Sequence, residues 1–551
     1  MSGGLPMSLD ARWPAAAIRL ETHFDGRSLR CYSDRPPHLG AMVRAATAAR
    51  LDQPALIDGG QTLTWRQVHA LSASLAHGLA QQGLGAGDRA VVLMGNHAGF
   101  VIALLALVQL GAVAVPVSTR EAPPGIAWIL EQCQAKALLA DAVQMQRLAE
   151  ADLPLPAGLR VCLEDPSQPV TPMPGWLSGH AMLALSAWPT HAEPDEQATA
   201  VILYTSGTTG RPKGAMLTHL NLVHSVLHYR HALGLNADDR ALLAVPASHV
   251  TGLVAIVLAM AGVGGCTVML REFKAAACLQ ALQAHRVSYS LMVPAMYALC
   301  LREPALAQTD LSCWRLAGFG GAPMPVATIE ALRAQCPGIR LFNAYGATET
   351  TSPTTLTPPD SVQVDKVGIP LPCAQVRVVD EDGRDLPAGQ SGEVWIAGPM
   401  VVPGYWDNPQ ATAAGFQDGY WKSGDVGTLD EQGFLQIHDR KKDMINRGGY
   451  KVFSVEVENC LMAHPEVQEA ATVGVPCPVL GERTHAFVYS ASNHPDALEA
   501  ELSQWCKRHL ADYKVPDRWT WLAQPLPRNA NGKVIKTTLR QQALAQAEAR
   551  T

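Results

Sequence analysis

The sequence has few charged residues and no strong excess of either sign. Charged side chains make up 17% of the 551 residues, against about 25% in an average soluble protein. Lys and Arg number 43 and Asp and Glu 49, which gives a formal net charge of −6. Proteins that bind nucleic acids usually carry a basic excess. We therefore expect no nucleic-acid partner.

The twelve cysteines lack the spacing of metal or haem sites. No Cys-x-x-Cys occurs in the chain, and that pair is the usual mark of zinc and haem sites. The first thirty residues also lack the apolar core of a signal peptide, because charged residues such as Asp10, Arg12 and Arg19 interrupt them. Free thiols fit a reducing compartment. We expect a cytoplasmic protein.

The apolar run at residues 100–117 is interrupted only by Gln109, and it could be interpreted in two ways. A membrane-spanning helix needs about 20 apolar residues. The alternative is a buried helix that ends at Gly111, followed by a buried strand at 112–117. The stop signals favour the second interpretation. The run at 253–270 contains three glycines and is interpreted in the same way, so we expect no transmembrane segment.

Three kinds of pattern follow one another along the chain. Residues 1–40 are polar and aperiodic, which indicates an N-terminal extension. From about 41 to 340, apolar segments such as 89–94 alternate with helical stretches rich in Ala and Leu, a pattern typical of parallel sheets covered by helices. From about 365 to 438, alternating runs are separated by acidic-Gly turns, for example at 380–383, which predicts a β-meander.

A cluster of five charged residues at 439–443 marks a domain boundary. We predict an N-terminal extension at 1–40, a large domain at 41–440 and a C-terminal domain at 441–551, the last of ordinary domain size. The predicted fold class is α/β. The large domain is expected to contain parallel βα-layered subdomains and a β-meander or barrel subdomain, and the C-terminal domain to be a small α+β unit.

The segment at 205–214, Thr-Ser-Gly-Thr-Thr-Gly-Arg-Pro-Lys-Gly, directly follows an apolar strand at 201–204. Glycines let backbone N–H groups converge on phosphate oxygens, hydroxyls donate further hydrogen bonds, and a lysine neutralises charge. A flexible surface turn is the alternative. The spacing differs from a Walker A loop. The candidate phosphate-binding residues are Thr205, Ser206, Gly207, Thr208, Thr209, Gly210 and Lys213.

This loop resembles the signature loop of the acyl-adenylate-forming superfamily, in its acyl-CoA synthetase type. The resemblance extends from about residue 45 to 540, because further motifs follow in the family's order. The segment at 343–349, Asn-Ala-Tyr-Gly-Ala-Thr-Glu, is similar to the family's Tyr-Gly-x-Thr-Glu element. The resemblance assigns Tyr345 to adenine, Thr348 to the α-phosphate and Glu349 to Mg²⁺. It also places Asn343 and Gly346 in the nucleotide site.

Two further segments resemble the parts of the family site that hold adenine and the acyl group. Gly-Phe-Gly-Gly-Ala-Pro at 318–323 places Gly320, Gly321 and Ala322 there, although a plain turn is the alternative. Pro-Ala-Ser-His-Val-Thr-Gly at 246–252 resembles the acyl-pocket motif and singles out His249. Without that context, His249 would be interpreted as a core histidine. The Asp by which amino-acid-activating relatives bind an ammonium group is absent here.

Three motifs near the boundary and the C-terminus complete the resemblance. Ser-Gly-Asp at 423–425 implies that Asp425 binds the ribose hydroxyls. The charged segment implies that Arg440 binds ribose or phosphate and that Lys442 is the hinge, although a solvated charge run is the alternative. Gly448 and Gly449 would line the pantetheine tunnel. Pro-x-x-x-x-Gly-Lys at 527–533 singles out Lys533 as the catalytic lysine, and the alternative is an exposed tail lysine.

The resemblance implies a two-step reaction with ATP, Mg²⁺ and coenzyme A. A carboxylic acid, fatty or aromatic, becomes an acyl-adenylate and then an acyl-CoA thioester. The implied catalytic residues are Lys533, Thr348, Glu349, Lys213 and His249. Three alternatives stay open: an adenylation enzyme that loads a carrier-protein thiol, a P-loop kinase or ATPase that releases ADP, and an inactive binding protein. Whether the chain forms a homodimer is also left open.

Overall fold

The computed structural model describes residues 12–24, 26–151, 155, 158–186, 192–205, 211–322, 324–358, 361, 363, 366–490, 495–528 and 534–548. The chain forms two compact units. The larger comprises Met1–Val376, Trp395–Lys422 and Gln432–Leu435, and the smaller comprises Arg377–Val394, Ser423–Glu431 and Gln436–Thr551. The predicted division at 41–440 and 441–551 stays a prediction.

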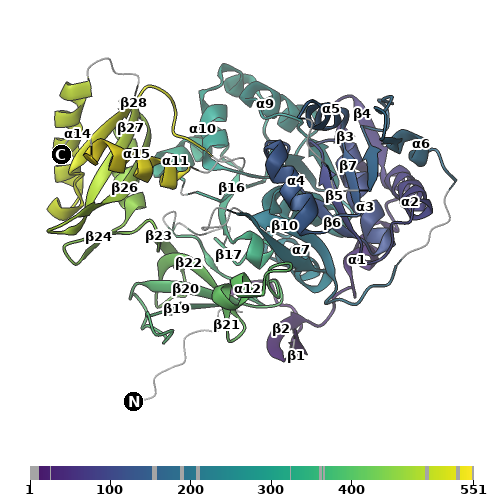
Figure 1. The fold of residues 1–551 in the computed structure, drawn as a ribbon, viewed down its shortest axis with the longest axis horizontal. Coiled ribbons are helices and arrows are strands. Elements are labelled where there is room, and N and C mark those ends of the chain that lie inside the picture. The colour runs from purple at the N-terminus through teal and green to yellow at the C-terminus, as the bar shows by residue number, and fades with distance from the viewer. Residues whose placement is uncertain are drawn as a thin grey trace. The chain divides into compact units, whose positions relative to one another are not determined.

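Two large sheets form the core of the larger unit (Figure 1). The first has seven strands, which are all parallel to their neighbours except the edge strand formed by residues 213–218. In spatial order these are β11 (Lys213–Thr218), β10 (Thr199–Thr205), β6 (Val113–Pro116), β5 (Arg89–Leu93), β7 (Ala137–Ala140), β8 (Leu159–Cys162) and β9 (Leu177–Ser178). Helices α4 (Pro123–Gln132) and α5 (Ala142–Glu150) pack their buried side chains against this sheet.

The second sheet has nine strands, of which the central ones are parallel. In spatial order these are β18 (Ile369–Pro370), β17 (Thr355–Leu356), β16 (Arg340–Tyr345), β15 (Leu316–Phe319), β14 (Tyr289–Met292), β12 (Arg240–Leu243), β13 (Cys266–Met269), β3 (Pro54–Asp58) and β4 (Gln61–Thr64). Its core contains side chains from α9 (Ala275–Ala284), α10 (Pro294–Arg302) and α11 (Val326–Gln335). The βα alternation expected from the sequence is confirmed.

The long apolar run forms the predicted helix and strand. Helix α3 (Ala98–Leu110) ends at Gly111, whose φ of 67° is left-handed, and β6 follows directly. The helix contacts β5 and β6 of the first sheet and β3 of the second, which explains why it is apolar on every side. Among the described residues, no helix has the length and apolar composition needed to cross a membrane.

The N-terminal segment is more ordered than its sequence suggested. Strands β1 (Ile18–His23) and β2 (Arg27–Tyr32) form an antiparallel hairpin, and α1 (Leu39–Thr47) begins before residue 40. Leu29 and Cys31 are buried and alternate with more exposed neighbours. The prediction of an aperiodic segment was wrong because this short alternation lies among polar residues, and the Asp-Gly turn signal at 25–26 was not used.

The predicted β-meander is confirmed. Strands β19 (Gln375–Val379), β20 (Gly392–Ala397), β22 (Tyr420–Leu429) and β21 (Phe416–Gln417) form a sheet in that order, and β23 (Leu435–Arg440) pairs with β22. Helix α12 (Pro409–Gly415) lies before β21 in the sequence. Both acidic-Gly turns end in a glycine of positive φ, 80° at Gly383 and 78° at Gly433, a conformation that glycine adopts without strain.

The smaller unit contains its own α+β layer, drawn in yellow-green in Figure 1. Its sheet has the order β25 (Tyr450–Val452), β24 (Ile445–Arg447), β27 (Gly481–Ser490) and β26 (Val467–Cys477), with β28 (Arg518–Leu522) beside β27. Side chains of α13 (Ser454–Met462) and α14 (Pro495–His509) pack with Ala470 of β26. Side chains of α15 (Lys536–Glu548) pack with its neighbour Ala471. Because neighbouring residues of a strand face opposite ways, the helices cover both faces.

Candidate active site at the carboxyl ends of the parallel strands

Several of the predicted site residues follow parallel strands of the nine-stranded sheet. β12, β14, β15 and β16 run parallel, so their carboxyl ends share one edge. Gly320 follows β15, Gly346 follows β16 and His249 follows β12. A Cβ atom at Gly320 would lie 2.4 Å from Ala344 O, so glycine is needed for the close approach of the two chain segments. Ligands of open α/β sheets bind at such an edge.

Asn96 connects the edges of the two large sheets. It follows β5 of the first sheet, and its side-chain amide donates to Val245 O at 3.0 Å and to Leu270 O at 3.2 Å. Its Oδ1 accepts from the backbone N–H of Ala247 at 2.8 Å. These bonds fix the loop that leads from β12 to His249. Asn96 was not among the residues predicted from the sequence.

Glu349 is the centre of a polar cluster that combines two predicted motifs. Its side chain is 8% exposed, and Oε1 accepts hydrogen bonds from Thr205 Oγ1 at 3.4 Å and from Tyr405 Oη at 3.0 Å. Thr205 Oγ1 also lies 3.4 Å from Lys213 O. Thr205, Lys213 and Glu349, which come from two of the predicted motifs, thus lie together in the structure.

Tyr405 is a member of this cluster that sequence reasoning missed. Its ring lies 5.3 Å from Lys213 Nζ, in a cation–π arrangement. Burial, together with the neighbouring Glu349 carboxylate, raises the pKa of Tyr405 far above its usual value, so the phenol remains a hydrogen-bond donor. The next residue, Trp406, donates its backbone N–H to Gly214 O at 2.7 Å. Gly-Tyr-Trp matches no motif that sequence analysis had singled out.

The backbone next to Glu349 is strained. Thr351 and Ser352 both have positive φ, 51° and 46°, although neither is glycine. Such conformations cost about 1–3 kcal/mol each and gather at functional sites. The surrounding contacts hold them, since Ser352 Oγ lies 2.7 Å from Tyr229 Oη and Thr350 Oγ1 accepts from Ala347 N–H at 2.9 Å.

His249 is partly exposed and begins an irregular helix. Its backbone N–H donates to Pro246 O at 3.1 Å, and its carbonyl accepts from Leu253 N–H at 2.8 Å. A π-helix at Thr251–Leu258 follows, and such turns are frequent at functional sites. A Cβ at Gly252 would lie 2.2 Å from Pro246 O, so Gly252 permits the tight turn that presents His249.

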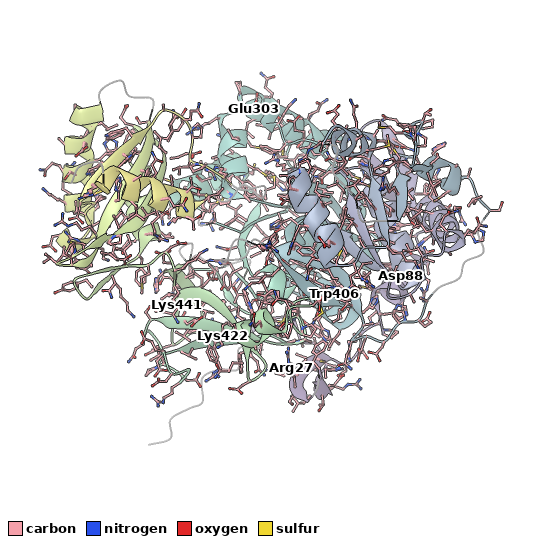
Figure 2. All side chains as sticks on the ribbon, in the orientation of Figure 1. Arg27, Asp88, Glu303, Trp406, Lys422 and Lys441 are labelled. Atoms are coloured by element: carbon pink, nitrogen blue, oxygen red, sulfur yellow. The ribbon has the colours of Figure 1, made fainter. Side chains whose placement is uncertain are left out.

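The smaller unit brings two other predicted residues together. Arg440 Nε lies 2.7 Å from Asp425 Oδ1, and Asp425 is the more buried partner. The backbone N–H of Asp425 donates to Ser423 Oγ at 3.0 Å, and Ser423 in turn donates to Val394 O at 2.6 Å. Lys441, labelled in Figure 2, forms a separate ion pair with Glu393 at 3.0 Å.

The remaining predicted residues are placed as follows. Gly448 and Gly449, with φ of 63° and 89°, form the exposed turn between β24 and β25. Tyr345 is the last residue of β16 and pairs with Thr355. Asn343 pairs with Phe319, and Thr348 begins the short helix that contains Glu349. Gly321 and Ala322 follow Gly320. Ser206, Gly207, Thr208, Thr209, Gly210 and Lys533 lie outside the described residues.

The donor set around Glu349 fits a magnesium ion. Mg²⁺ prefers carboxylate and other oxygen ligands and keeps several waters. Both hydrogen bonds to the carboxylate reach Oε1, and no hydrogen bond between described residues reaches Oε2. One carboxylate oxygen is therefore oriented by hydroxyl groups, and the other is left for a cation.

Comparison with known protein families agrees with this geometry. Residues 43–406 match the model of the AMP-binding enzyme, and residues 456–533 match that of the AMP-binding enzyme C-terminal domain. The chain belongs to the AMP-binding enzyme family. The resemblance to the acyl-adenylate-forming superfamily is confirmed.

Curated relatives of this family match over almost their whole length. The chain is 33% identical to a feruloyl-CoA synthase from Amycolatopsis sp. over 92% of this chain and 97% of the relative. It is 34% identical to a medium-chain fatty-acid–CoA ligase from Escherichia coli over 89% of this chain and 87% of the relative.

Solved AMP-binding enzymes share the fold. An anthranilate CoA ligase in complex with anthranoyl-AMP superposes with a TM-score of 0.84 at 25% identity, covering 94% of this chain and 99% of that chain. The o-succinylbenzoate CoA synthetase from Bacillus subtilis, in complex with ATP and a magnesium ion, gives a TM-score of 0.78 at 30% identity, covering 92% and 99%. The predicted α/β fold class is confirmed.

Proposed function

We propose that this protein is an ATP-dependent, AMP-forming ligase that joins a fatty or aromatic carboxylic acid to coenzyme A. The observation that carries the proposal is that Thr205 Oγ1 lies within hydrogen-bond distance of both Lys213 O and Glu349 Oε1, while the Lys213 ammonium lies over the ring of Tyr405, whose hydroxyl also bonds Glu349. A phosphate-loop residue, a cation and a metal-ligand candidate thus lie in one cluster. Relatives that match over most of their length are named as a feruloyl-CoA synthase and as fatty-acid–CoA ligases, which supports the same reaction here.

The first step forms an acyl-adenylate. A carboxylate oxygen of the acid attacks the α-phosphorus of ATP, the bond to the β-phosphate breaks, and pyrophosphate leaves with the electron pair. We assign Lys213 and the loop 205–210 to the phosphates, Thr348 to the α-phosphate and Glu349 to Mg²⁺. When bound, the magnesium ion neutralises charge on the phosphates. The protein's part is positioning and electrostatic stabilisation, to which Lys533 adds a further positive charge.

The second step transfers the acyl group. The sulfur of coenzyme A attacks the acyl carbonyl carbon, and the bond to the AMP oxygen breaks. We propose that Gly448 and Gly449 line the path of the pantetheine arm, since two glycines present no side chain to the passing ligand. We also propose that the C-terminal domain changes position between the steps. Asp425 would accept the ribose hydroxyls, with Arg440 beside it.

The acid is proposed to be uncharged apart from its carboxylate. Val250, Gly252 and Phe319, which border the proposed acyl position, are buried and apolar or small. Tyr345, Gly320, Gly321 and Ala322 are proposed to border adenine. The segments at 246–252 and 318–323 contain no Lys or Arg for a second carboxylate and no Asp or Glu for an ammonium group, which supports an apolar acyl body.

The cellular location and the oligomeric state of the enzyme are also proposals. All twelve cysteines lie among the described residues and none of them forms a disulfide, which supports a reducing, cytoplasmic location. Formation of a homodimer stays a hypothesis, and sedimentation of the purified chain would test it.

An acid screen tests the proposal. Purified protein with ATP, Mg²⁺ and coenzyme A is given straight-chain fatty acids, cinnamic-type acids and benzoic acids, and AMP and acyl-CoA are measured. Equal amounts of AMP and acyl-CoA with at least one acid are expected. The same assay is repeated with a pantetheinylated carrier protein in place of coenzyme A. Faster acyl transfer to the carrier protein than to coenzyme A would favour the carrier-loading alternative.

A further inference from the structure

The segment Gly404–Trp406 is bound to the edge of β11 as an added strand. Met216 N–H donates to Gly404 O at 3.1 Å, and Trp406 N–H donates to Gly214 O at 2.7 Å. Ala215 and Tyr405 form the antiparallel bridge between these bonds. Strand pairing of this kind fixes the direction of a side chain, and here it directs Tyr405.

The surroundings of Tyr405 hold it further in place. Its backbone N–H donates to Thr412 Oγ1 at 3.0 Å, and its ring packs edge-on against Phe416 at 5.8 Å. The side chain is 7% exposed. A buried side chain with this many contacts has little rotational freedom, so its hydroxyl is presented in one direction.

Glu349 is bound to the same segment at both its backbone and its side chain. Val402 N–H donates to Glu349 O at 2.9 Å, and Tyr405 Oη donates to Oε1 at 3.0 Å. The second hydroxyl on Oε1, that of Thr205, is 3.4 Å away and is shared with Lys213 O. The Tyr405 bond is therefore the stronger restraint on the carboxylate.

We propose that Tyr405 is a positioning residue for adenylation, which orients the Glu349 carboxylate for Mg²⁺ and Lys213 for the ATP phosphates. The inference rests on the proposed function of the site. The hydroxyl occupies Oε1 so that Oε2 faces the cation, and the ring face supports the Lys213 ammonium at 5.3 Å. Tyr405 thereby sets the relative position of the metal ligand and the phosphate-binding lysine.

The test uses Tyr405→Phe, which removes the hydroxyl and keeps the ring. Binding of Mn²⁺·ATP, measured by electron paramagnetic resonance without acid or coenzyme A, is expected to weaken about 10-fold, the effect of losing one hydrogen bond to a charged group. The Mg²⁺ concentration that half-saturates acid-dependent pyrophosphate exchange should rise by a similar factor. The KM values for acid and coenzyme A should not change.

The matched control is Tyr420→Phe, which also removes a tyrosine hydroxyl bonded at 3.0 Å, here to Gln375 Oε1. It should leave Mn²⁺·ATP binding at the wild-type value. Tyr405→Leu should weaken binding more than Tyr405→Phe, because it also removes the ring beside Lys213. If Tyr405→Phe binds Mn²⁺·ATP as tightly as the wild-type protein does, the proposal is overturned.

A double-mutant cycle separates positioning from a loss of folding. In a Glu349→Gln background, Tyr405→Phe should have little further effect on Mn²⁺·ATP binding, because the residue acts through that carboxylate. An undiminished 10-fold effect in this background would also overturn the inference. If the wild-type chain forms acyl-CoA and AMP but Tyr405→Phe does not weaken Mn²⁺·ATP binding, the inference is wrong and the proposed function stands. If the wild-type chain forms neither product, the proposed function itself fails.

Discussion

Arg440 Nε lies 2.7 Å from Oδ1 of Asp425 in the smaller unit. Both residues are assigned to the nucleotide, and in the structure they bind each other. Arg440 is about half exposed, whereas Asp425 is buried. The ion pair holds the Asp425 carboxylate in one orientation, in which it can accept hydrogen bonds from the two hydroxyls of the ribose.

Replacement of Asp425 by Asn should weaken ATP binding. The amide keeps the size of the side chain, but it loses the charge and one acceptor. A hydrogen bond to a charged group contributes about 1.5–3 kcal/mol, so the KM for ATP should rise at least about 10-fold with an unchanged KM for the acid. Lys441→Met is the control, since the Lys441–Glu393 pair is a surface pair worth about 0–1 kcal/mol. An unchanged KM for ATP in Asp425→Asn would contradict the ribose assignment.

Lys533→Ala should abolish adenylation and spare the second step. We propose that the Lys533 ammonium group stabilises the negative charge that develops on the phosphates during adenylation. No such charge develops on a pyrophosphate when a supplied acyl-adenylate reacts with coenzyme A. Acid-dependent pyrophosphate exchange and acyl transfer from synthetic acyl-adenylate measure the two steps separately. Lys507→Ala, at an exposed position of α14, is the control. An equal loss of rate in both steps would contradict the proposed role of Lys533.

Lys442→Pro tests the proposed hinge. Lys442 is exposed and lies in a turn, where Asp443 N–H and Met444 N–H donate to Arg440 O at 2.9 Å. Proline fixes φ near −65° and would restrict rotation there. The overall rate should fall while each half-reaction measured alone changes less. Unchanged kinetics throughout would count against a hinge at this position.

Stability should depend on pH through His224, which connects the N-terminal hairpin to helix α7 (His219–Leu233). Nδ1–H donates to Leu220 O at 2.9 Å, and Nε2 accepts from Tyr32 N–H at 3.3 Å, so the ring is neutral. Burial lowers the pKa of His224 to about 3; the hydrogen bond to Leu220 O and the charge of Glu21 oppose this shift, and Arg35 and His23 add to it.

The direction of the pH dependence of stability follows from proton linkage. The unfolded chain takes up a proton near pH 6.5 and the native ring does not, so the stability is full above pH 6.5 and decreases as the pH falls toward about 3. The loss for this group is about 1.4 kcal/mol per pH unit. Urea unfolding at pH 7, 6 and 5 measures it. His224→Leu should lower the slope by about that amount and leave the contribution of other buried histidines such as His219, whose pKa burial also lowers, and His77→Gln should leave the slope unchanged. The same slope in His224→Leu and wild type would contradict this account.

The sequence predicted those parts of the structure that local patterns determine. Gly111 ends α3 as expected because a left-handed cap favours glycine. Thr205 and Glu349, 144 residues apart, could be placed together only through the family resemblance, since no local pattern connects two distant loops. Tyr405 was missed for the same reason, because its role comes from strand pairing with Ala215. The β1–β2 hairpin was missed because its apolar alternation is short.

The product ratio in the acid screen tests the central claim most directly. With an accepted acid, the account predicts one AMP and one pyrophosphate for each acyl-CoA formed, and none of these products without the acid. Release of ADP and phosphate instead, or formation of AMP with no thioester for any acid in the screen, would contradict an AMP-forming acid:CoA ligase.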